Sequence, residues 1–318
     1  MISCTEFIPL YSEFFKYLEA RGGYGAVVKY WEYVSDNRLG DTNNPLTLAS
    51  FIERDGGFWG AVNYWNLTLK EEACDLLQIL NPKERYSYSL MRHCPSKGRL
   101  LELEHVEPYP HYCEHCKVIF SRLLEKHGVV YERDHSMVDR AMCSSILYEK
   151  GNKPTIDFTK PTPECEVVDM KASDNKYLHP GFHISLDIAL RYCGLTYGLD
   201  EVVSFLKKYT HDYYAPQIKE ISAGGLSVLE EWIKSTYRNE EHEEYVHTEN
   251  TGRRLTVTVD KCPAIEFMNK VNHKPSPSHI ETTRTLYSTV AEECGMKFVL
   301  EFFNEEDGKA KYYFEIGD

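Results

Sequence analysis

Two cysteines and two histidines lie within one short segment about a third of the way along the chain. Residues 111–116 read HYCEHC, so Cys113 precedes Cys116 by three positions and His111 and His115 alternate with them. Thiolate sulfur and neutral imidazole nitrogen are ligands that suit zinc or iron. Cys94, at the end of the preceding predicted strand, is a further candidate ligand. The spacing therefore predicts a metal site built from these five residues.

Two other interpretations fit the same cysteines. A cysteine at the start of a helix has a lowered thiol pKa, because backbone N–H groups and the helix dipole favour the thiolate. Cys113 or Cys116 could then be a nucleophile or a redox group. The third interpretation places both on the apolar face of a helix over 112–127, as small core residues. A structural zinc site normally has a second ligand pair, and the sequence holds no other Cys-x-x-Cys, so all three interpretations stay open.

Carboxylates in and near this segment are candidates for acid and base chemistry. Glu114 lies in the first turn of the predicted helix, and Glu281 occupies the matching position about 167 residues later, followed by Arg284. Such a carboxylate either interacts with the helix N-terminus or lines a pocket. In a pocket, Glu114 could be a general base, and Arg284, on the same helical face as Glu281, could bind a carboxylate ligand bidentately. We therefore expect the catalytic residues among Cys113, His115, Glu114, Glu281 and Arg284.

The segment around these residues occurs twice. Residues 108–131 and 275–298 both contain Pro-x-Pro, an apolar helical stripe, a glycine and a β-branched or aromatic run. Gly128 and Gly295 end the two predicted helices, where a positive φ is expected. Upstream, a period-two strand leads into Cys-Pro in both copies. Roughly 140 residues are thus duplicated, about 10–150 and 180–318.

The second copy has different residues at the two cysteine positions. Ile280 and Thr283 match Cys113 and Cys116, so the fold can form without either cysteine. Whatever these cysteines do is an addition to the first copy.

Hydrophobic periodicity predicts helices first in each copy, then one strand, two helices and a closing β-hairpin. In the first copy the helices break at Gly22-Gly23, and a later helix covers 73–80. Asp307-Gly308 is a hairpin turn signal near the end of the chain. The fold class is α+β, with an antiparallel sheet in each of two tandem repeats. We expect a first repeat over 1–150, a linker rich in Pro, Asp, Lys and Thr over 151–180, and a second repeat over 181–318.

Composition excludes several classes of function. With 318 residues, 27% charged and 42% hydrophobic, the chain is typical of globular proteins. Its net charge of -13 argues against nucleic-acid and anionic-membrane partners. No apolar run approaches the roughly 20 residues of a membrane span, and the N-terminus lacks a signal-peptide pattern, so we expect a cytoplasmic protein with reduced thiols. No Gly-rich phosphate loop is present, so no nucleotide cofactor is expected.

Two polar features of the second copy are interpreted as having no functional role. The acidic run from Glu240 to Glu244 reads as a solvated helix face or loop. His183, next to the first predicted helix of this copy, could reach a pocket, but most isolated histidines do not.

The second copy resembles the L-2-amino-thiazoline-4-carboxylic acid hydrolase-like family. The motifs that carry the resemblance follow one another in the same order: Cys262-Pro263, Pro-Ser-Pro at 275–277, Glu-Glu-Cys-Gly at 292–295, Phe-Phe-Asn-Glu-Glu-Asp-Gly at 302–308 and Tyr-Tyr-Phe at 312–314. That family is similar to the vinyl-reductase-type small-molecule-binding domains, which commonly pair about a two-fold axis. The resemblance implies an internal pseudo-two-fold, in a monomer that is a pseudo-dimer or in a homodimer, with a ligand pocket in one or both halves.

The resemblance implies a hydrolase that opens a C–N bond of a small cyclic, carboxylate-bearing substrate. Cys113, His115 and Cys116 would bind one zinc or iron ion or supply a thiolate, Glu114 would be the general base, and the second copy would be a scaffold. The alternative is a non-catalytic sensor module that binds a small molecule or a metal. A duplicated structural protein with no ligand is a third possibility.

Overall fold

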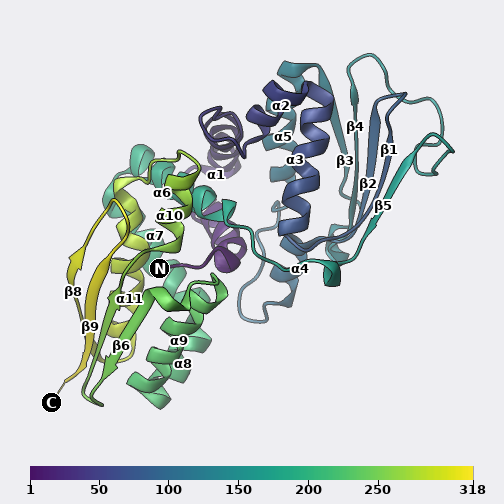
Figure 1. The fold of residues 1–318 in the computed structure, drawn as a ribbon. Helices are drawn as coiled ribbons and strands as arrows, with labels where there is room; N and C mark the ends of the chain where they lie inside the picture. The colour runs from purple at the N-terminus through teal and green to yellow at the C-terminus, as the bar shows by residue number, and fades with distance from the viewer. Residues whose placement is uncertain (318) are drawn as a thin grey trace. The chain divides into compact units, whose positions relative to one another are not determined.

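The computed structural model describes residues 1–317 and has an α+β fold with two antiparallel sheets, as predicted. The chain forms two compact units. Residues 15–179 form the first, which we call the central unit. Residues 1–14 and the chain from Pro180 onward form the second, which we call the terminal unit. Helix α1 (Phe7–Val34) contributes residues to both (Figure 1).

The central unit contains a five-stranded antiparallel sheet of order β3-β4-β2-β1-β5. Its strands are β1 (Asp75–Asn81), β2 (Tyr86–His93), β3 (Val129–Asp134), β4 (Cys143–Glu149) and β5 (Glu166–Met170). Its other helices are α2 (Leu48–Asp55), α3 (Gly57–Glu71), α4 (Pro95–Glu102) and α5 (Glu114–Leu124), with a π-helix η2 (Ser35–Leu39) and 3-10 turns η3 (Glu125–His127), η4 (Val138–Arg140) and η5 (Ala172–Asp174). Helices α3 and α5 pack on one face of the sheet (Figure 1). There, the ring of Trp65 lies 4.7 Å from that of Phe120 and 5.2 Å from that of Tyr131.

The helix predicted over 73–80 is wrong, because this segment is strand β1. Its residues pair with β2 from Asp75↔His93 to Asn81↔Tyr86. A short apolar run such as DLLQIL cannot be assigned to helix or strand by periodicity alone. The partner strand β2 decides it, since pairing satisfies the backbone groups of both. The sheet is therefore built from two hairpins, β1–β2 and β3–β4, and not from one strand and one hairpin.

The segment 151–180, expected to be a linker, contributes β5 to this sheet. Residues 166–170 pair antiparallel with residues 76–80 of β1. The strand lies at the sheet edge, and only Met170 of its residues is buried, while Val167 and Val168 are 50% and 42% exposed. An edge strand with so little burial has no clear hydrophobic alternation, which is why the sequence did not indicate it.

The terminal unit contains a four-stranded antiparallel sheet of order β6-β7-β9-β8. Its strands are β6 (Val246–Asn250), β7 (Arg254–Val259), β8 (Met296–Phe303) and β9 (Ala310–Ile316). Its helices are α6 (Gly181–Tyr197), α7 (Leu199–Tyr213), α8 (Ala215–Gly224), α9 (Leu226–Asn239), α10 (Pro263–Lys270) and α11 (Glu281–Glu293), with 3-10 turns η1 (Cys4–Glu6), η6 (Glu243–Tyr245) and η7 (Pro277–Ile280). The turn predicted at Asp307-Gly308 joins β8 to β9, with Gly308 at a φ of 71°. Strand β6, like β1, was not predicted.

The two sheets have matching strand orders. If β1–β4 are matched with β6–β9, one sheet reads β3-β4-β2-β1 and the other β8-β9-β7-β6. In each unit one helix that begins at a Cys-Pro, α4 or α10, follows the second of these strands. A longer helix, α5 or α11, precedes the third, and it begins at Glu114 or Glu281. The glycines after these longer helices, Gly128 and Gly295, have φ of 70° and 65°, as predicted.

Glycine corners join consecutive helices in both halves of the chain. Gly23 interrupts α1 with φ 68° and ψ -176°, at the break that the sequence predicts. Gly198, between α6 and α7, has φ 100° and ψ 164°. Gly56, before α3, and Gly225, before α9, have φ/ψ of 83°/163° and 67°/-151°. This region of backbone conformation is essentially restricted to glycine. These corners end one helix and start the next without an intervening loop.

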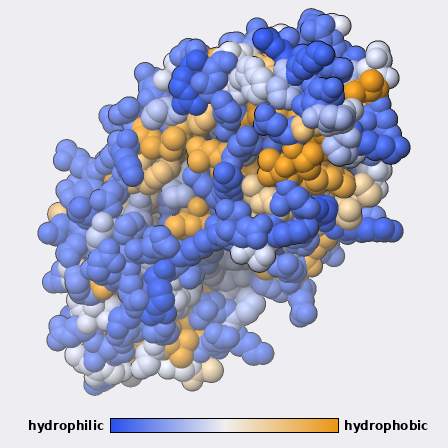
Figure 2. All heavy atoms as spheres, turned by 45° about the vertical axis from the view of Figure 1, so that its right-hand side comes forward, coloured by the Kyte–Doolittle hydropathy of each residue, from blue (hydrophilic) through white to orange (hydrophobic). Residues whose placement is uncertain are grey.

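Polar side chains cover most of the face drawn in Figure 2, with apolar patches between them. This agrees with a sequence that carries 49 acidic and 36 basic residues. Within residues 1–317, no helix has the length and apolar character needed to cross a bilayer.

Candidate functional site

Four cysteines of the central unit lie close to the guanidinium of Arg133. Cys94 immediately precedes α4, Cys113 and Cys116 stand at the start of α5, and Cys143 begins β4. Nη2 of Arg133 donates to Sγ of Cys143 over 2.9 Å, and the charge of Arg133 acts on the other three thiols as well. All four are free thiols.

Cys94 has a structural role at its place in the fold. Its backbone N–H donates to the carbonyl of Ala141 over 2.6 Å, and its Sγ accepts the N–H of Lys97 over 3.4 Å. It is therefore the N-cap of α4, and Pro95 follows at the first helical position. Burial raises the pKa of the Cys94 thiol well above its usual value. The Cys94 thiol is half-buried and stays protonated at neutral pH.

Cys116 has the lowest thiol pKa of this group. Its Sγ lies 3.4 Å from Nε2 of His115. Burial alone would raise the pKa of Cys116, but the positive charge of Arg133 and then the contact with His115 outweigh it, so that the pKa falls to about 7. By contrast, burial raises the pKa of Cys113 to about 12 and also raises that of Cys143.

His115 is oriented to accept the proton of Cys116. Its Nδ1 contacts the backbone carbonyl of Tyr112, and since a carbonyl only accepts, Nδ1 must carry the proton of that bond. In the neutral ring, Nε2 then has a lone pair toward the thiol. Burial alone would lower the pKa of His115, but the charge of Cys116 and the hydrogen bonds of the ring outweigh this effect, so that the net shift of the pKa is upward. A thiol, a base and a group that holds the base are the parts of an activated cysteine nucleophile.

Arg133 has one buried donor without a hydrogen-bond partner in the described part of the chain. Its Nη1 donates to the hydroxyl of Tyr131 over 2.6 Å, and its Nη2 donates to Cys143. Its Nε is buried and has no hydrogen-bond partner among residues 1–317. Buried donors are normally satisfied, so this atom is a candidate contact for a ligand oxygen.

The predicted metal ligands of the central unit do not form one group. His111 points to Glu114 on the outside, with Nδ1 2.7 Å from Oε1, and the two side chains are 48% and 43% exposed. His115 and Cys116 are half-buried and contact each other instead. In the part of the chain that the structure describes, the one group of three metal-ligating side chains lies elsewhere, in the terminal unit. The separation arises because residues 111 and 115 leave the helix start in different directions.

Glu114 is not placed to act on Cys116. The hydroxyl of Tyr24 and Nδ1 of His111 hydrogen-bond its two carboxylate oxygens. Burial alone would raise the pKa of Glu114, but these contacts lower it below its usual value, which makes the carboxylate a poorer base.

Glu281 and Arg284 form the ion pair that their spacing predicts. Nη1 of Arg284 lies 2.7 Å from Oε1 of Glu281, and the hydroxyl of Thr285 donates to Oε2 over 2.6 Å. Glu281 is buried and both of its oxygens are occupied, whereas Arg284 is about half exposed. These contacts are those of a structural pair on α11.

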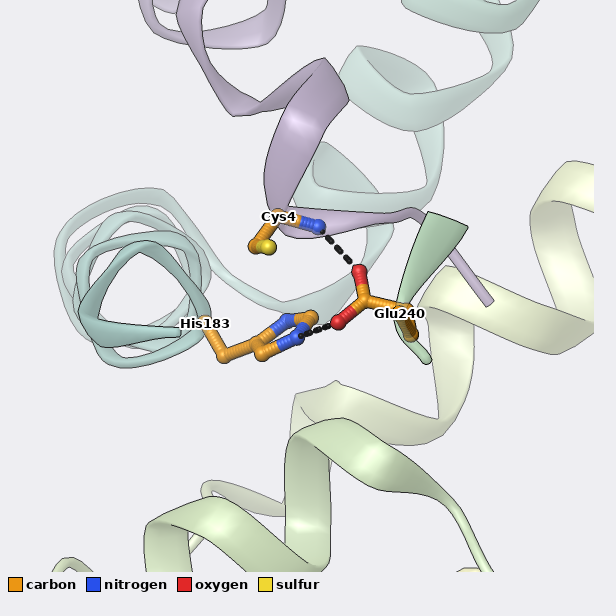
Figure 3. Close-up of side chains that lie close together, drawn as sticks. All are labelled: Cys4, His183 and Glu240. Atoms are coloured by element: carbon orange, nitrogen blue, oxygen red, sulfur yellow. Dashed lines mark hydrogen bonds and ion pairs between the residues drawn. The ribbon is translucent and has the colours of Figure 1, made fainter. Parts of the chain in front are cut away.

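Sequence reasoning missed a buried polar cluster in the terminal unit (Figure 3). Cys4 comes from η1, His183 from the first turn of α6 and Glu240 from the residue after α9, and they are 1%, 1% and 5% exposed. One ligand atom of each lies within 4.8 Å of the others. The expectation that the run from Glu240 is solvated is therefore wrong for its first residue. Cys4 and Glu240 are 236 positions apart, and nothing in their local pattern links them.

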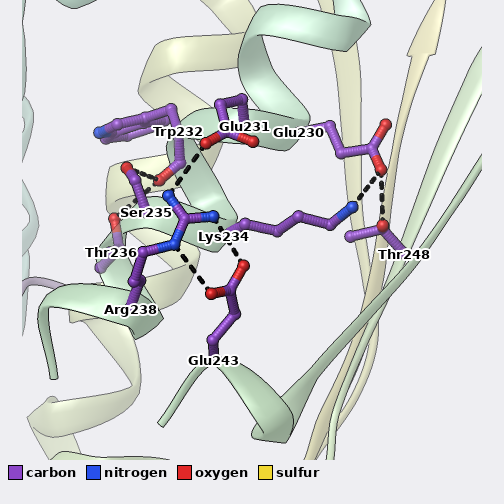
Figure 4. A network of polar contacts seen from close by, with 9 residues as sticks. All are labelled: Glu230, Glu231, Trp232, Lys234, Ser235, Thr236, Arg238, Glu243 and Thr248. Atoms are coloured by element: carbon purple, nitrogen blue, oxygen red, sulfur yellow. Dashed lines mark hydrogen bonds and ion pairs between the residues drawn. The ribbon is translucent and has the colours of Figure 1, made fainter. Parts of the chain in front are cut away.

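The turn that carries Glu240 is held by an ion pair. Arg238, in the last turn of α9, donates through Nε and Nη2 to both oxygens of Glu243 over 2.8 and 2.6 Å (Figure 4). Near the start of the same helix, Glu230 accepts from the hydroxyl of Thr248 in β6 over 2.7 Å and from Nζ of Lys234 over the same distance. These contacts hold the start of α9 against β6 and its end against η6, and Glu240 lies buried in the turn between Arg238 and Glu243.

A second buried polar group surrounds Asp187 of α6, which is fully buried. Its Oδ2 lies 2.9 Å from Nε2 of His273, and its Oδ1 accepts the N–H of Ser276 over 2.8 Å and lies 3.5 Å from Nδ1 of His279. Burial alone would raise the pKa of Asp187, but the two histidines hold it well below its usual range. For His279, burial acts to lower the pKa, yet Asp187 and the nearby thiol of Cys262 raise it to about 9.

Comparison with known proteins finds no match to a family model, to a curated protein or to a solved structure. The resemblance to the thiazoline-carboxylate hydrolase family stays a prediction, and function has to be inferred from these two units and their side chains.

Proposed function

We propose that the chain is a cysteine hydrolase that opens a C–N bond of a small cyclic substrate bearing a carboxylate. The observation that supports it best is the position of Cys116, with His115 3.4 Å away and Arg133 beside it. With a thiol pKa of about 7, about half of this cysteine is thiolate at neutral pH. Thiolate is the nucleophilic form, so the site is poised for covalent catalysis near neutral pH.

The reaction begins when Nε2 of His115 holds the thiol proton and the sulfur of Cys116 adds to the ring carbon that is bonded to nitrogen. His115 then gives the proton to that nitrogen as the C–N bond breaks, which leaves the carbon bonded to sulfur. A water molecule, deprotonated by His115, attacks this carbon and releases the thiolate, which takes the proton back. The sum is substrate plus water to the ring-opened product.

Arg133 would bind the carboxylate of the substrate. Its buried Nε, without a partner among the described residues, is a donor that a carboxylate oxygen can use. A guanidinium suits a carboxylate because it offers charge and parallel N–H groups together. The same charge favours the thiolate, so binding and activation depend on one side chain.

We also propose that the two units arose by the tandem duplication predicted from the sequence. The matching strand orders, the glycine corners and the Cys-Pro before α4 and α10 support this. Because Ile280 and Thr283 replace the cysteine pair in the second copy, the proposed chemistry belongs to the central unit alone. The internal pseudo-two-fold stays a prediction. A reducing compartment such as the cytoplasm would keep Cys116 as a thiol.

The test combines thiol labelling with a turnover assay. Iodoacetamide labelling of the full chain, read for each cysteine by peptide mass spectrometry from pH 5 to 9, should show Cys116 reacting with a midpoint near pH 7. Hydrolysis is assayed on a panel of small cyclic carboxylates, beginning with 2-amino-thiazoline-4-carboxylate. Cys116→Ser should lower turnover at least about 100-fold. Cys113→Ser, on the same helix, is the matched control and should retain turnover within about two-fold.

Two outcomes would reject the thiolate mechanism. One is a labelling midpoint for Cys116 near the ordinary value of 9.0. The other is equal loss of turnover in Cys113→Ser and Cys116→Ser, which would point to a paired role of the two cysteines.

The second candidate function is a sensor module that binds a small molecule or a zinc or iron ion without turnover. The buried group of Cys4, His183 and Glu240 favours it, because these residue types are metal ligands. Affinity without hydrolysis of any substrate in the panel would support this candidate over the hydrolase.

A further inference from the structure

Three metal-ligating side chains of different types converge in the terminal unit. Figure 3 shows Cys4, His183 and Glu240 pointing toward one another from three separate segments of the chain. All three are more than nine-tenths buried. Burial of a thiol, an imidazole and a carboxylate together is unusual unless they are paired or bind a metal.

The distances suit one small ion after slight movement. Bonds from zinc of about 2.0 Å to nitrogen or oxygen and about 2.3 Å to sulfur place tetrahedral ligand atoms about 3.3 to 3.8 Å apart. Nε2 of His183 and Oε2 of Glu240 are 2.9 Å apart and share a proton, and no two ligand atoms of the group are more than 4.8 Å apart. An ion that replaces the shared proton would require these ligand atoms to shift by about 1 Å.

Glu240 is held in place by bonds that a metal ion would leave intact. Its Oε1 accepts from the hydroxyl of Ser3 and from the backbone N–H of Cys4, each over 2.6 Å. Its Oε2 is left for the ion. Hydrogen bonds that fix a ligating carboxylate are typical of the surroundings of metal sites.

His183 has a ring nitrogen that lacks a partner. Nδ1 is buried, and no group within residues 1–317 hydrogen-bonds it. Buried polar atoms are satisfied in the great majority of cases, so an unsatisfied imidazole nitrogen beside a thiol and a carboxylate points to a missing partner. Either ring nitrogen can be the ligand, while the other would be left for a hydrogen bond.

Charge selects a divalent ion. The thiolate of Cys4 and the carboxylate of Glu240 together carry two negative charges, and a metal-bound imidazole is neutral. A divalent cation makes the site neutral, which avoids the cost of a net charge in the interior. Sulfur and nitrogen ligands favour zinc or iron over magnesium or calcium.

We propose that Cys4, His183 and Glu240 bind one zinc ion, with the fourth tetrahedral position open to water. This site lies within the terminal unit and does not depend on the chemistry proposed for Cys116. Three protein ligands and one open position are the pattern of zinc sites that bind small molecules or activate water.

The test uses the full chain, loaded with zinc and desalted. Elemental analysis should find about one zinc per chain. Cys4→Ser should weaken zinc binding at least about 100-fold in a chelator competition, since loss of a partner that only supports a ligand already costs about 10- to 100-fold. Cys294→Ser, a half-buried cysteine of the same unit, is the control and should leave the affinity unchanged.

Cobalt replacement separates loss of a ligand from loss of fold. Cobalt-loaded wild type should show a thiolate-to-cobalt charge-transfer band, which Cys4→Ser should lack while its circular dichroism stays native. Glu240→Gln should also lose zinc. A wild-type chain that stays metal-free after loading, or a thiolate band that persists in Cys4→Ser, would overturn the proposal.

The same variants keep the two proposals distinct. Cys116→Ser is expected to lose turnover and retain its zinc. Zinc lost in Cys116→Ser but retained in Cys4→Ser would instead place the ion in the central unit and reject the site proposed here.

Discussion

The buried pair of Asp187 and His279 should make the stability of the terminal unit depend on pH. His279 has a pKa of about 9 in the folded chain, above its ordinary value of 6.5, so folding favours its protonated form. Its contribution is fully present below about pH 6.5 and is lost as the pH rises through about 9. The surrounding groups are His273, Arg191 and Cys262.

We expect the free energy of unfolding to fall by on the order of 2 kcal/mol more in wild type than in His279→Asn between pH 7 and 10. Urea unfolding at the two pH values measures this difference, and the comparison cancels other groups that titrate in the same range. His247→Asn, which removes an exposed histidine paired with Asp260, should match wild type. An identical pH dependence in wild type and His279→Asn would show that the pair does not stabilise the fold.

The sequence indicated part of the thiol site and could not indicate the rest. The Cys-x-x-Cys at a helix start predicted a lowered thiol pKa, and Cys116 has one. The choice between Cys113 and Cys116 depends on how closely Arg133 and His115 approach each thiol. Arg133 comes from β3, which follows the helix, and the packing of the sheet against the helix sets its approach. The burial of Glu240 could not be predicted from its neighbours in sequence either, because its partners Ser3 and Cys4 lie more than 230 residues before it.

At the scale of elements, the glycine corners should be sensitive to a single methyl group. Gly23 has a φ of 68° and a ψ of -176°, which an alanine adopts only with strain. Gly25 lies two residues later in regular helix, and a Cβ there meets nothing within 4 Å. Gly23→Ala should therefore destabilise the central unit by about 1 to 3 kcal/mol. Gly25→Ala should stabilise it by up to about 1 kcal/mol.

Chemical denaturation of both variants provides the measurement. The two positions differ in backbone conformation and share open surroundings, since a Cβ at Gly23 also meets nothing within 4 Å. If Gly23→Ala lowers the free energy of unfolding and Gly25→Ala raises it, the backbone conformation of Gly23 alone accounts for the loss of stability. Equal changes in the free energy of unfolding would contradict the prediction, because they would mean that alanine adopts the conformation of Gly23 without strain.

Helices and strands with a clear hydrophobic period and a glycine or turn at their ends could be predicted from the sequence. Strands that form only because they pair with a neighbouring strand could not. The closing hairpin and helices α5 and α11 follow from periodicity and from their glycine ends. Strands β1, β5 and β6 needed a neighbouring strand to become strands. Their own sequences are too short, too exposed or too uniformly apolar to distinguish strand from helix or loop.

At the scale of the whole molecule, the terminal unit requires residues from both ends of the described chain. Ile2, Leu10 and Phe14 are at most 1% exposed, and the ring of Phe14 packs 4.9 Å from that of Phe205. The expected second repeat, residues 181–318, lacks all of them. This boundary could not be predicted, because residues 1–14 read as the start of the first repeat.

A fragment of residues 180–318 should therefore be much less stable than the same fragment preceded by residues 1–14 through a flexible linker. Burial of three large apolar side chains contributes about 5 kcal/mol. Thermal and urea unfolding of the two fragments would measure the difference in stability. A linked fragment that carries Leu10→Ser and Phe14→Ser is the control and should lose most of the stability that residues 1–14 add. Equal stability of all three would show that residues 1–14 are dispensable.

The split origin of the terminal unit also sets an order for synthesis. Residues 1–14 leave the ribosome before the central unit, and their partners in α6 to α11 follow only after the whole central unit has been made. At about 5 to 20 residues per second, the apolar side of this first helical segment waits roughly 8 to 30 s for its binding surface. During that interval the central unit has time to fold, while the apolar side chains of residues 1–14 lack the surface that buries them in the terminal unit.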